Sequence, residues 1–513
     1  MESVYPSVLF SSSEEVEVSP TADPAAALDL HLDRIAAAVT NGREAYDLAP
    51  YFATAPTSPD GVAYRQEVFR DLEREGVLAG VRAFVQAMRS VHQGLEQAAK
   101  MHYRRQRERW FLDSVRDYCR TVQELALALA EADLRSRGLR AVRDHLDAYL
   151  RSGSFRALRE EADAIRSALE EVRYCVWIRD STVTVRAFEG EEDYSRQVEG
   201  TFERFRTSSG KSYVVALRDW LEMNHIEAEI LDLVARLYPD EFERLSRFHD
   251  THADFIDPVI ARFEREIQFY LGYLDMIDPL RRAGLPFCYP ELTDRWSGTF
   301  VRSSFDLALA IQLTAQGGGI PVTNDWRLDG AEHIVVVTGP NSGGKTTFAR
   351  ALGQAHHLAR LGCPIPGEQA RLRLVDTVFT HFERREDALS AVGKLEDDLI
   401  RIRDILVRAS ERSLIVANEM LASTTLRDAA ALGRRILERI RALGALCVWV
   451  TFIDELAAAD GNVVSMVAAV QDDDPTVRTY RIVRRPPMGR AYALSVARRH
   501  GLTYESVRRR IGA

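Results

Sequence analysis

A glycine-rich segment in the second half of the chain combines the residue types that bind a phosphate chain. Its sequence GPNSGGKT, which begins at Gly339, fits the pattern G-x-x-x-x-G-K-[ST] at every fixed position. Glycines let backbone N–H groups close around phosphate oxygens, and the helix-forming run that follows adds the partial positive charge of a helix N-terminus. We predict an ATP-binding loop made of Gly339, Pro340, Asn341, Ser342, Gly343, Gly344, Lys345, Thr346 and Thr347.

Two side chains of this loop have predicted roles beyond binding. Lys345 would reach the β- and γ-phosphates and assist catalysis, and the Thr346 hydroxyl would be a ligand of Mg²⁺. ATP and Mg²⁺ are therefore the predicted substrate and cofactor. The alternative is a chance match in an ordinary strand–turn–helix. The apolar run from Ile334 to Val337 argues against it, because the motif requires a strand before the loop.

A second motif follows the apolar run from Leu414 to Ala417, which ends in Asn418-Glu419. In P-loop ATPases an apolar strand ending in two acids supplies a carboxylate near magnesium and a base for water. Glu419 fits the catalytic base. Asn418 departs from the pattern, because its amide oxygen can accept a hydrogen bond from a magnesium-bound water but brings no negative charge. We therefore expect weaker magnesium binding.

The apolar run from Ala445 to Val450 ends at Thr451-Phe452. Many ATPases of the ABC type have a histidine after this strand, where it senses the γ-phosphate. Phe452 occupies that switch position here and cannot donate a hydrogen bond. Together with Asn418, it predicts an ATPase whose turnover is low.

Apolar β-forming runs alternate with helical runs after the glycine loop. Alternation of this kind predicts a mainly parallel sheet with helices on both faces, and ligands bind at the carboxyl ends of such strands. The predicted fold class is multidomain, α and α/β: a mostly helical domain with a small β-hairpin insertion, followed by a P-loop ATPase domain of the ABC type. The predicted boundaries are a flexible acidic tail over 1–25, the helical domain over 26–295 with a hairpin at about 173–190, and the ATPase domain over 296–513.

The helical region contains one run with a heptad pattern. Its apolar residues Phe155, Leu158, Ala162, Ile165, Leu169 and Val172 follow steps of 3 and 4, and Ser154 is the predicted cap. This spacing predicts a helical arm packed along a neighbouring helix. Further helices are expected from Tyr213 to about His252.

Four arginines cluster near Tyr103 and Trp110. Such a run forms either a phosphate-contacting patch with stacking residues or a solvated helix face, and the second is the commoner outcome. The candidate DNA contacts are Arg104, Arg105, Arg107 and Arg109.

Bulk properties narrow the class of protein. The formal charge of −9 provides no global basic field for nucleic acid. The five scattered cysteines suggest reduced thiols rather than a disulfide framework. No apolar run approaches the ~18 residues of a membrane span, and the N-terminus lacks a signal-peptide pattern. These features predict a cytoplasmic protein with no membrane partner.

The motifs together resemble those of the MutS family of mismatch-repair ATPases. The run TGPNSGGKTT resembles the family's TGPN-x-x-GK-[ST]-T, and the Asn after the proline is a family trait. The segments 376–380, 413–428, 451–456 and 490–497 resemble further family motifs. The resemblance is strong over about 300–510 and weaker over about 50–295.

The resemblance implies a homodimer formed through the ATPase domains, in which a signature segment acts in trans on the partner's nucleotide. Ser390 is the residue of that segment that carries over, and Thr424 and Asp428 fall in a D-loop-like segment. Adenine would lie near the Pro321–Asn324 loop. DNA and a repair or other protein are the implied partners.

The short region before residue 50 has no room for the family's mismatch-reading domain, so we expect a short MutS-like form. Two functions remain open. One is an ATPase whose nucleotide state moves helical levers on DNA in repair or recombination, with direct mismatch reading doubtful. The other is a low-turnover ATP-binding switch or scaffold that binds proteins. An SMC-type ATPase fits less well, because such chains begin with the glycine loop and insert a long coiled coil.

Overall fold

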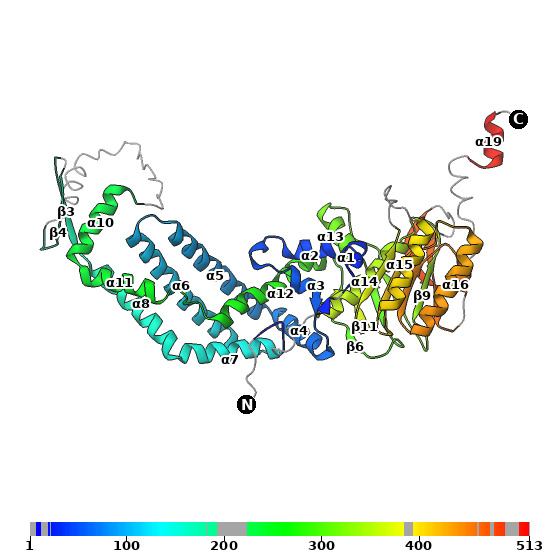
Figure 1. Cartoon of the computed structure of the whole chain (residues 1–513), viewed down its shortest axis with the longest axis horizontal. Helices are drawn as coiled ribbons and strands as arrows, with labels where there is room; N and C mark the ends of the chain where they lie inside the picture. Colours follow the sequence, from blue (N-terminus) through cyan, green and yellow to red (C-terminus); the bar gives the residue numbers. More distant parts are fainter. Residues whose placement is uncertain are drawn as a thin grey trace, which may run out of the picture. The chain divides into compact units, whose positions relative to one another are not determined.

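The computed structural model describes residues 7–11, 19–20, 22–180, 182–191, 223–383, 393–458, 461–471, 477–487 and 502–511 (Figure 1). The chain divides into two units. Unit 1 comprises Met1–Leu72, Arg135–Ala141 and Arg265–Ala513, and unit 2 comprises Glu73–Leu134 and Val142–Glu264. The units do not follow the expected boundaries near 25 and 295, because the first 72 residues group with the carboxyl-terminal half.

Unit 2 is built mainly from helices. Helices α5 and α6 pack along each other, and α8 and α11 pack on α6. In α6 the buried residues Phe111, Val115, Val122 and Leu129 recur at helical spacing, which gives the helix one core face. Its helices are α5 (Glu75–Lys100), α6 (Arg104–Glu131), α8 (Gly153–Glu171), α10 (His225–Leu237) and α11 (Pro239–Thr251), while α7 (Arg137–Arg151) and α12 (Pro258–Arg282) contribute to both units.

The predicted heptad seam lies on α8. Phe155, Leu158, Ala162 and Ile165 are buried, and Leu169 and Val172 pack against a cluster that includes α10 residues. The cap differs from the prediction. The Ser152 hydroxyl, not that of Ser154, accepts a hydrogen bond from the Phe155 backbone N–H at 3.1 Å, so the helix begins one residue before Ser154.

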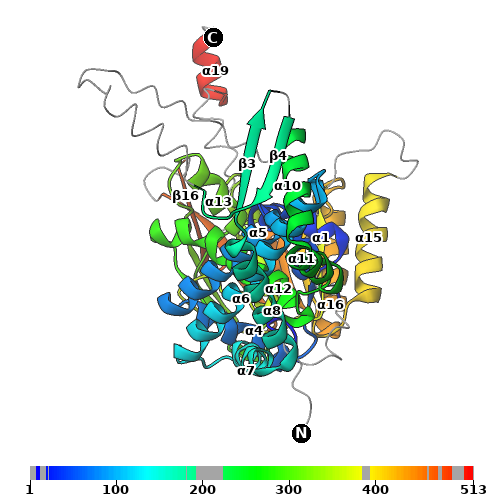
Figure 2. The ribbon, with the colours of Figure 1, turned by 90° about the vertical axis from the view of Figure 1, so that its left-hand side faces the viewer.

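A hairpin follows α8, where the sequence predicts one. Strands β3 (Tyr174–Arg179) and β4 (Thr182–Ala187) pair antiparallel, and Figure 2 shows them beside α10. The helix expected from Tyr213 falls partly on residues 192–222, which lie outside the described residues. Helix α10 begins after a capping box formed by Asn224 and Glu227.

The main sheet of unit 1 has six strands in the order β12-β13-β14-β9-β15-β16. Neighbouring strands are parallel from β12 to β15, and β16 is antiparallel to β15. Every residue of β9 and β14 is buried, as expected for central strands covered on both faces. The strands are β9 (Ile334–Thr338), β12 (Val378–Phe382), β13 (Leu414–Asn418), β14 (Leu446–Val450), β15 (Val463–Val470) and β16 (Arg478–Arg484), and the helices are α14 (Lys345–Leu361), α15 (Lys394–Arg408), α16 (Leu426–Leu443) and α17 (Asp454–Ala457).

A smaller sheet precedes the glycine loop in the chain. Its strand order is β6-β11-β7-β8, and β8 and β16 are edge strands of their respective sheets. The sequence predicts neither the strands of this small sheet nor β15. The elements of this region are β5 (Phe287–Cys288), β6 (Glu291–Thr293), β7 (Phe300–Ser304), α13 (Leu307–Ala315), β8 (Asn324–Arg327), β10 (Ile365–Pro366) and β11 (Gln369–Arg373).

The segment expected to be a flexible acidic tail differs from that prediction at residues 7–10. The Ser7 hydroxyl and the Val8 backbone N–H both donate to the Glu266 carboxylate, at 2.7 and 2.8 Å. Val8 and Leu9 are buried. The apolar run Val8–Phe10 therefore belongs to the core, although the Ser/Glu-rich composition of the surrounding stretch suggests a flexible tail.

The remaining elements of the chain are short or lie near its ends. They are β1 (Ser19–Pro20), α1 (Pro24–Asp29), α2 (Leu32–Thr40), the 3₁₀ turn Glu44–Tyr46, α3 (Ala49–Ala53), β2 (Thr54–Ala55), α4 (Pro59–Leu72) and α19 (Tyr504–Ile511). Across the described ranges, no helix is long and apolar enough to cross a membrane.

Candidate nucleotide-binding site

The glycine loop joins the end of β9 to the start of α14. Gly339 and Gly344 have φ values of 117° and 90°, which favour glycine, and Ser342 also has a positive φ of 58°. A Cβ on Gly343 would lie 2.9 Å from the Pro340 carbonyl oxygen and 3.0 Å from the Ala468 Cβ. The loop therefore requires glycine both for its backbone conformation and for its close approach to β15.

Lys345 is buried at the first position of α14. Its ammonium group donates to the carbonyl oxygens of Gly339 and Pro340 at 3.0 and 3.1 Å, and to the Asn341 Oδ1 at 3.3 Å. Burial lowers the pKa of Lys345 below its ordinary value, and the negative charge of Glu419 acts in the opposite direction. The loop thus holds the buried Lys345 ammonium group among backbone carbonyl groups, and the charge of Glu419 is close enough to raise the pKa of this lysine.

Thr346 and Asn418 meet although 72 residues separate them. The Thr346 hydroxyl donates to the Asn418 Oδ1 at 2.8 Å. Asn418 ends β13, and in register it lies opposite Val450 of β14, which lies opposite Val337 of β9. Because the carboxyl ends of parallel strands share one edge of the sheet, this register brings the two motifs together.

These two neutral oxygen ligands suit a magnesium ion that also takes phosphate oxygens and water. The described part of the chain contains no group of three or more His, Cys, Asp or Glu side chains that could hold a metal. The chain therefore fits Mg²⁺ bound together with a nucleotide, rather than a protein cage.

Glu419 follows β13 in a constrained backbone conformation. Its φ is 52°, and its backbone N–H donates to the Val450 carbonyl oxygen at 2.9 Å. Leu421 also has a positive φ of 66° and is fully buried. Burial raises the pKa of Asp398 on α15, and the nearby Leu421 backbone N–H acts in the opposite direction. Left-handed conformations cost roughly 1 kcal/mol or more per non-glycine residue, so surrounding contacts must hold this loop.

A cavity of 720 Å³ connects these residues, a volume typical of small-molecule sites. Pro321, Val322 and Asn324, from the loop expected near adenine, line it together with the glycine loop and Glu419. Tyr480 of β16 also lines the cavity and was not among the predicted site residues. It is 52% exposed, and its Cβ lies 3.7 Å from the Cβ position of Gly344. Its aromatic side chain was the available signal, but no neighbouring motif in the sequence indicates that it lies at the nucleotide site.

The other candidate site residues lie outside this cavity or outside the described residues. Ser390 falls in 384–392, and the 490–497 segment falls in 488–501, neither of which is described. Phe452 is 46% exposed and, like Thr424 and Asp428, does not line the cavity. Asp428 instead belongs to the start of α16, where its backbone N–H donates to the capping Thr425 hydroxyl at 3.2 Å.

The arginine cluster at the start of α6 is engaged by neighbouring groups. Arg104 and Arg105 both donate to the carboxylate of Glu108, at 2.7 and 3.3 Å, and Glu108 is only 1% exposed. Arg105 also donates to the Ser246 hydroxyl of α11 at 2.7 Å. Arg107 donates to the Met101 carbonyl oxygen and Arg109 to Asp113. These contacts give the cluster a structural role within unit 2.

Comparison with known proteins assigns the carboxyl-terminal part of this mixed helical and α/β chain. Residues 335–510 match the family described as MutS domain V, an ATPase domain. Endonuclease MutS2 of Streptococcus thermophilus is 27% identical over 301 residues, which cover 58% of this chain and 36% of that protein. Endonuclease MutS2 of Gemmatimonas aurantiaca is 33% identical over 190 residues, which cover 36% of this chain and 23% of that protein. DNA mismatch repair protein MutS of Methanothrix thermoacetophila is 26% identical over 293 residues, which cover 56% of this chain and 33% of that protein.

The chain is similar to the MutS family over these residues. It spans about a third, or less, of the length of the curated relatives it matches.

Proposed function

We propose that this protein is a Mg²⁺-dependent P-loop ATPase of the MutS type whose nucleotide state moves its helical unit. The family that it resembles is one of DNA-repair-related ATPases. The observation that carries the proposal is the convergence of two separate motifs on one cavity. Lys345, Thr346 and Glu419 line it, and Asn418 accepts the hydrogen bond of Thr346.

The roles of the side chains follow from their positions. Backbone N–H groups of the glycine loop and the Lys345 ammonium bind the phosphates, and Tyr480 offers a ring for the adenine beside Val322. Thr346 and Asn418 would hold Mg²⁺, which when bound neutralises charge on the phosphate oxygens. Glu419 orients a water molecule and accepts its proton as it attacks the γ-phosphate.

Steady-state ATP hydrolysis with the Glu419→Gln variant tests the enzymatic half. The amide keeps the shape of the carboxylate but cannot accept the proton, so we expect turnover to fall about a hundredfold or more while ATP binding persists. Unchanged turnover in this variant would remove Glu419 from the catalytic role.

DNA is the proposed macromolecular partner. The matched relatives are named an endonuclease and a DNA mismatch repair protein, and we extend only their association with DNA to this chain. We also propose a homodimer formed through the ATPase domain, with the Ser390 segment acting in trans. Turnover measured with duplex, branched and single-stranded DNA tests the first point, and mass photometry with and without ATP tests the second. No response of turnover to any DNA would contradict the DNA role.

The second candidate is a low-turnover nucleotide switch that binds proteins. Asn418 favours it, because a neutral amide replaces the usual carboxylate beside Thr346. Tight ATP binding with negligible hydrolysis, no DNA response and nucleotide-dependent dimerisation would support this candidate over the first.

A further inference from the structure

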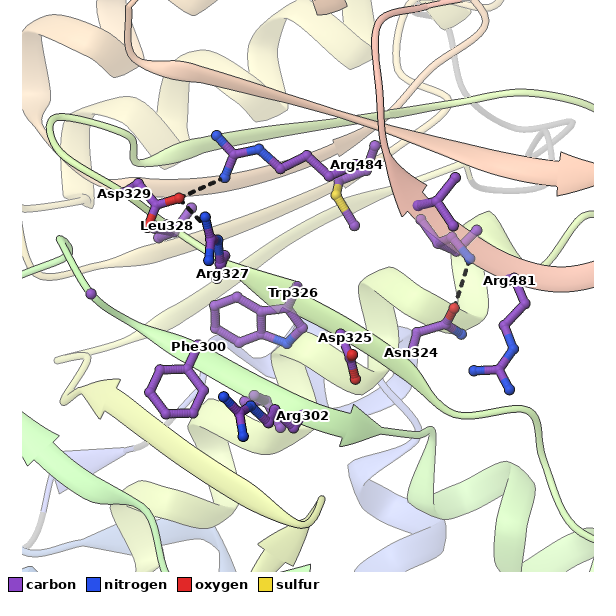
Figure 3. Close-up of a pocket in the computed structure, with 15 residues that line it drawn as sticks. Phe300, Arg302, Asn324, Asp325, Trp326, Arg327, Leu328, Asp329, Arg481 and Arg484 are labelled. Atoms are coloured by element: carbon purple, nitrogen blue, oxygen red, sulfur yellow. Dashed lines mark hydrogen bonds and ion pairs between the residues drawn. The ribbon is translucent and has the colours of Figure 1, made fainter.

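A second cavity of 710 Å³ lies between the small sheet and the main sheet of unit 1. Residues of β7, β8 and β16 line it, and we call it the β8–β16 cavity (Figure 3). Both β8 and β16 are edge strands, so side chains rather than a continuous backbone ladder bridge the two sheets there. Its volume falls in the range of ~300–1,000 Å³ that holds small ligands.

The lining is rich in positive charge, with four arginines against two aspartates: Arg302, Arg327, Arg481 and Arg484 against Asp325 and Asp329. The two aspartates are already engaged. Asp329 pairs with both Arg327 and Arg484, at 3.0 and 3.1 Å, and Asp325 accepts from the Ser303 backbone N–H at 2.7 Å.

Two guanidinium groups have no carboxylate partner among the described residues. Arg302 lies over the ring of Phe300, with its guanidinium carbon 5.8 Å from the ring centroid. The Arg481 guanidinium donates to the Thr323 carbonyl oxygen at 2.8 Å. Arginines keep their charge at any relevant pH, so the cavity holds two fixed cations that form no ion pair among the described residues, and the Asp325 carboxylate in the same lining offsets only part of their charge.

The direction of the donors selects the ligand class. Figure 3 shows Arg481 beside Asn324 at one side, Arg484 and Asp329 at the other, and Arg302 along β7. A phosphate group offers oxygens in several directions and can accept from guanidinium groups on different strands, whereas a single carboxylate offers one planar pair. Phe300 and the partly exposed Val483 supply an apolar wall for a sugar or base.

The β8–β16 cavity shares Asn324 with the nucleotide cavity. The Asn324 side chain accepts from the Ile482 backbone N–H at 2.6 Å and donates to the Tyr480 carbonyl oxygen at 3.2 Å. Arg481 holds Thr323, next to Val322 of the nucleotide cavity. A ligand that recruits Arg481 therefore competes with a contact that positions the nucleotide cavity wall.

We propose that the β8–β16 cavity is a second binding site, for a phosphate-bearing ligand of nucleotide size, and that its occupancy changes the affinity of the neighbouring nucleotide cavity. The phosphate can come from a free nucleotide or polyphosphate, or from a nucleic-acid strand. Linkage requires the effect to be reciprocal: a nucleotide in one cavity changes the affinity of the other by the same factor. The site goes beyond the proposed ATPase function, and only the coupling rests on it.

The test is calorimetric titration of the full chain with tripolyphosphate, in the presence of a saturating non-hydrolysable ATP analogue and Mg²⁺ to occupy the nucleotide cavity. Arg302→Ala and Arg481→Ala should each weaken binding about tenfold, the loss expected for a charged, forked hydrogen-bonding group. Arg439→Ala, an exposed arginine of α16 that lines neither cavity, is the matched control and should bind as the unmodified chain does. Arg302→Lys and Arg481→Lys keep the charge and test the forked geometry if an alanine variant fails to fold.

Further arms identify the source of the phosphate and separate the two cavities. A free nucleotide source predicts that tripolyphosphate binds more tightly than a short single-stranded oligonucleotide, and a nucleic-acid source predicts the reverse. Lys345→Ala, titrated without the analogue, should keep the tripolyphosphate site even if the proposed ATPase function is wrong. Binding unchanged in the Arg302 and Arg481 variants, no binding of either probe, or tighter binding of polyglutamate would overturn the phosphate site.

The coupling has its own readout. The affinity of the ATP analogue should change at least threefold when tripolyphosphate is present, and Arg481→Ala should abolish that change. If tripolyphosphate binds and leaves the analogue affinity unaltered, the coupling is refuted and the site stands.

Discussion

The glycine loop after β9 and the arginine run at the start of α6 both concentrate residues that can bind phosphate, and their surroundings differ. Lys345 is held by backbone carbonyls beside a cavity that also contains Glu419 from another strand. Arg104 and Arg105 converge instead on the buried Glu108 of their own helix. The lesson is that residue type suggests phosphate binding, but the partners decide whether a cation is available to a ligand.

Lys345→Ala should give the largest effect in this comparison. It removes the cation of the loop, so we expect ATP affinity to fall about a hundredfold or more. A fluorescent ATP analogue measures this directly. Arg439→Ala on α16 is the control, and comparable losses in both variants would indicate a nonspecific charge effect rather than a site.

Replacing both Arg104 and Arg105 with alanine should affect stability instead of nucleotide binding. Glu108 is 1% exposed and would keep a buried charge without its partners, which costs about 3 kcal/mol in the free energy of unfolding. Denaturant unfolding of unit 2 measures the loss, with Arg120→Ala, whose side chain is 66% exposed, as the control.

The same double variant also tests whether the arginine run binds DNA. If the double variant unfolds normally but loses salt-sensitive retention of duplex DNA, the arginine run is a ligand surface after all and its contacts with Glu108 are secondary.

Asp398→Asn should lower turnover about tenfold with little change in KM. The Leu421 backbone N–H, two residues after Glu419, favours the charged form of Asp398, and a neutral amide would interact less strongly with that strained loop. Asp397→Asn, on the same helix with a side chain 50% exposed, is the control. A rise in KM with turnover retained would show that Asp398 supports substrate binding and does not position the catalytic loop.

Asn418→Asp should have the smallest effect. A carboxylate beside the Thr346 hydroxyl adds the negative charge that Mg²⁺ prefers, so the magnesium concentration for half-maximal ATPase activity should fall about fivefold. Magnesium titration of the hydrolysis rate measures it. An unchanged magnesium dependence would place Asn418 outside the metal's surroundings.

Much of the main sheet follows from local sequence. Apolar β-forming runs flanked by glycine and polar residues predict β9, β13 and β14 within a residue or two, because continuous burial leaves few other places for such runs. The small sheet was missed, since its short strands with mixed polarity carry no clear period. Strand β15 was also missed, although its run Val463–Val470 is apolar except for Ser465. The flexible-tail prediction overlooked Val8 and Leu9 for a related reason: a brief apolar run is masked by its acidic surroundings.

The sequence by itself determined the glycine loop with Lys345 and Thr346, because phosphate binding requires those residue types at fixed spacing. It also determined Glu419, the acid that ends the second motif. Only the tertiary structure decided which of them meet. The sheet register brings Asn418 to Thr346, and β16 brings Tyr480 to the glycine loop from more than a hundred residues away. The tertiary structure also decided that Arg104 and Arg105 of α6 pair with Glu108, while Arg302 and Arg481 have no acidic partner among the described residues. A charge pattern along one chain does not specify the neighbours that folding supplies, and these neighbours set what each charge can bind.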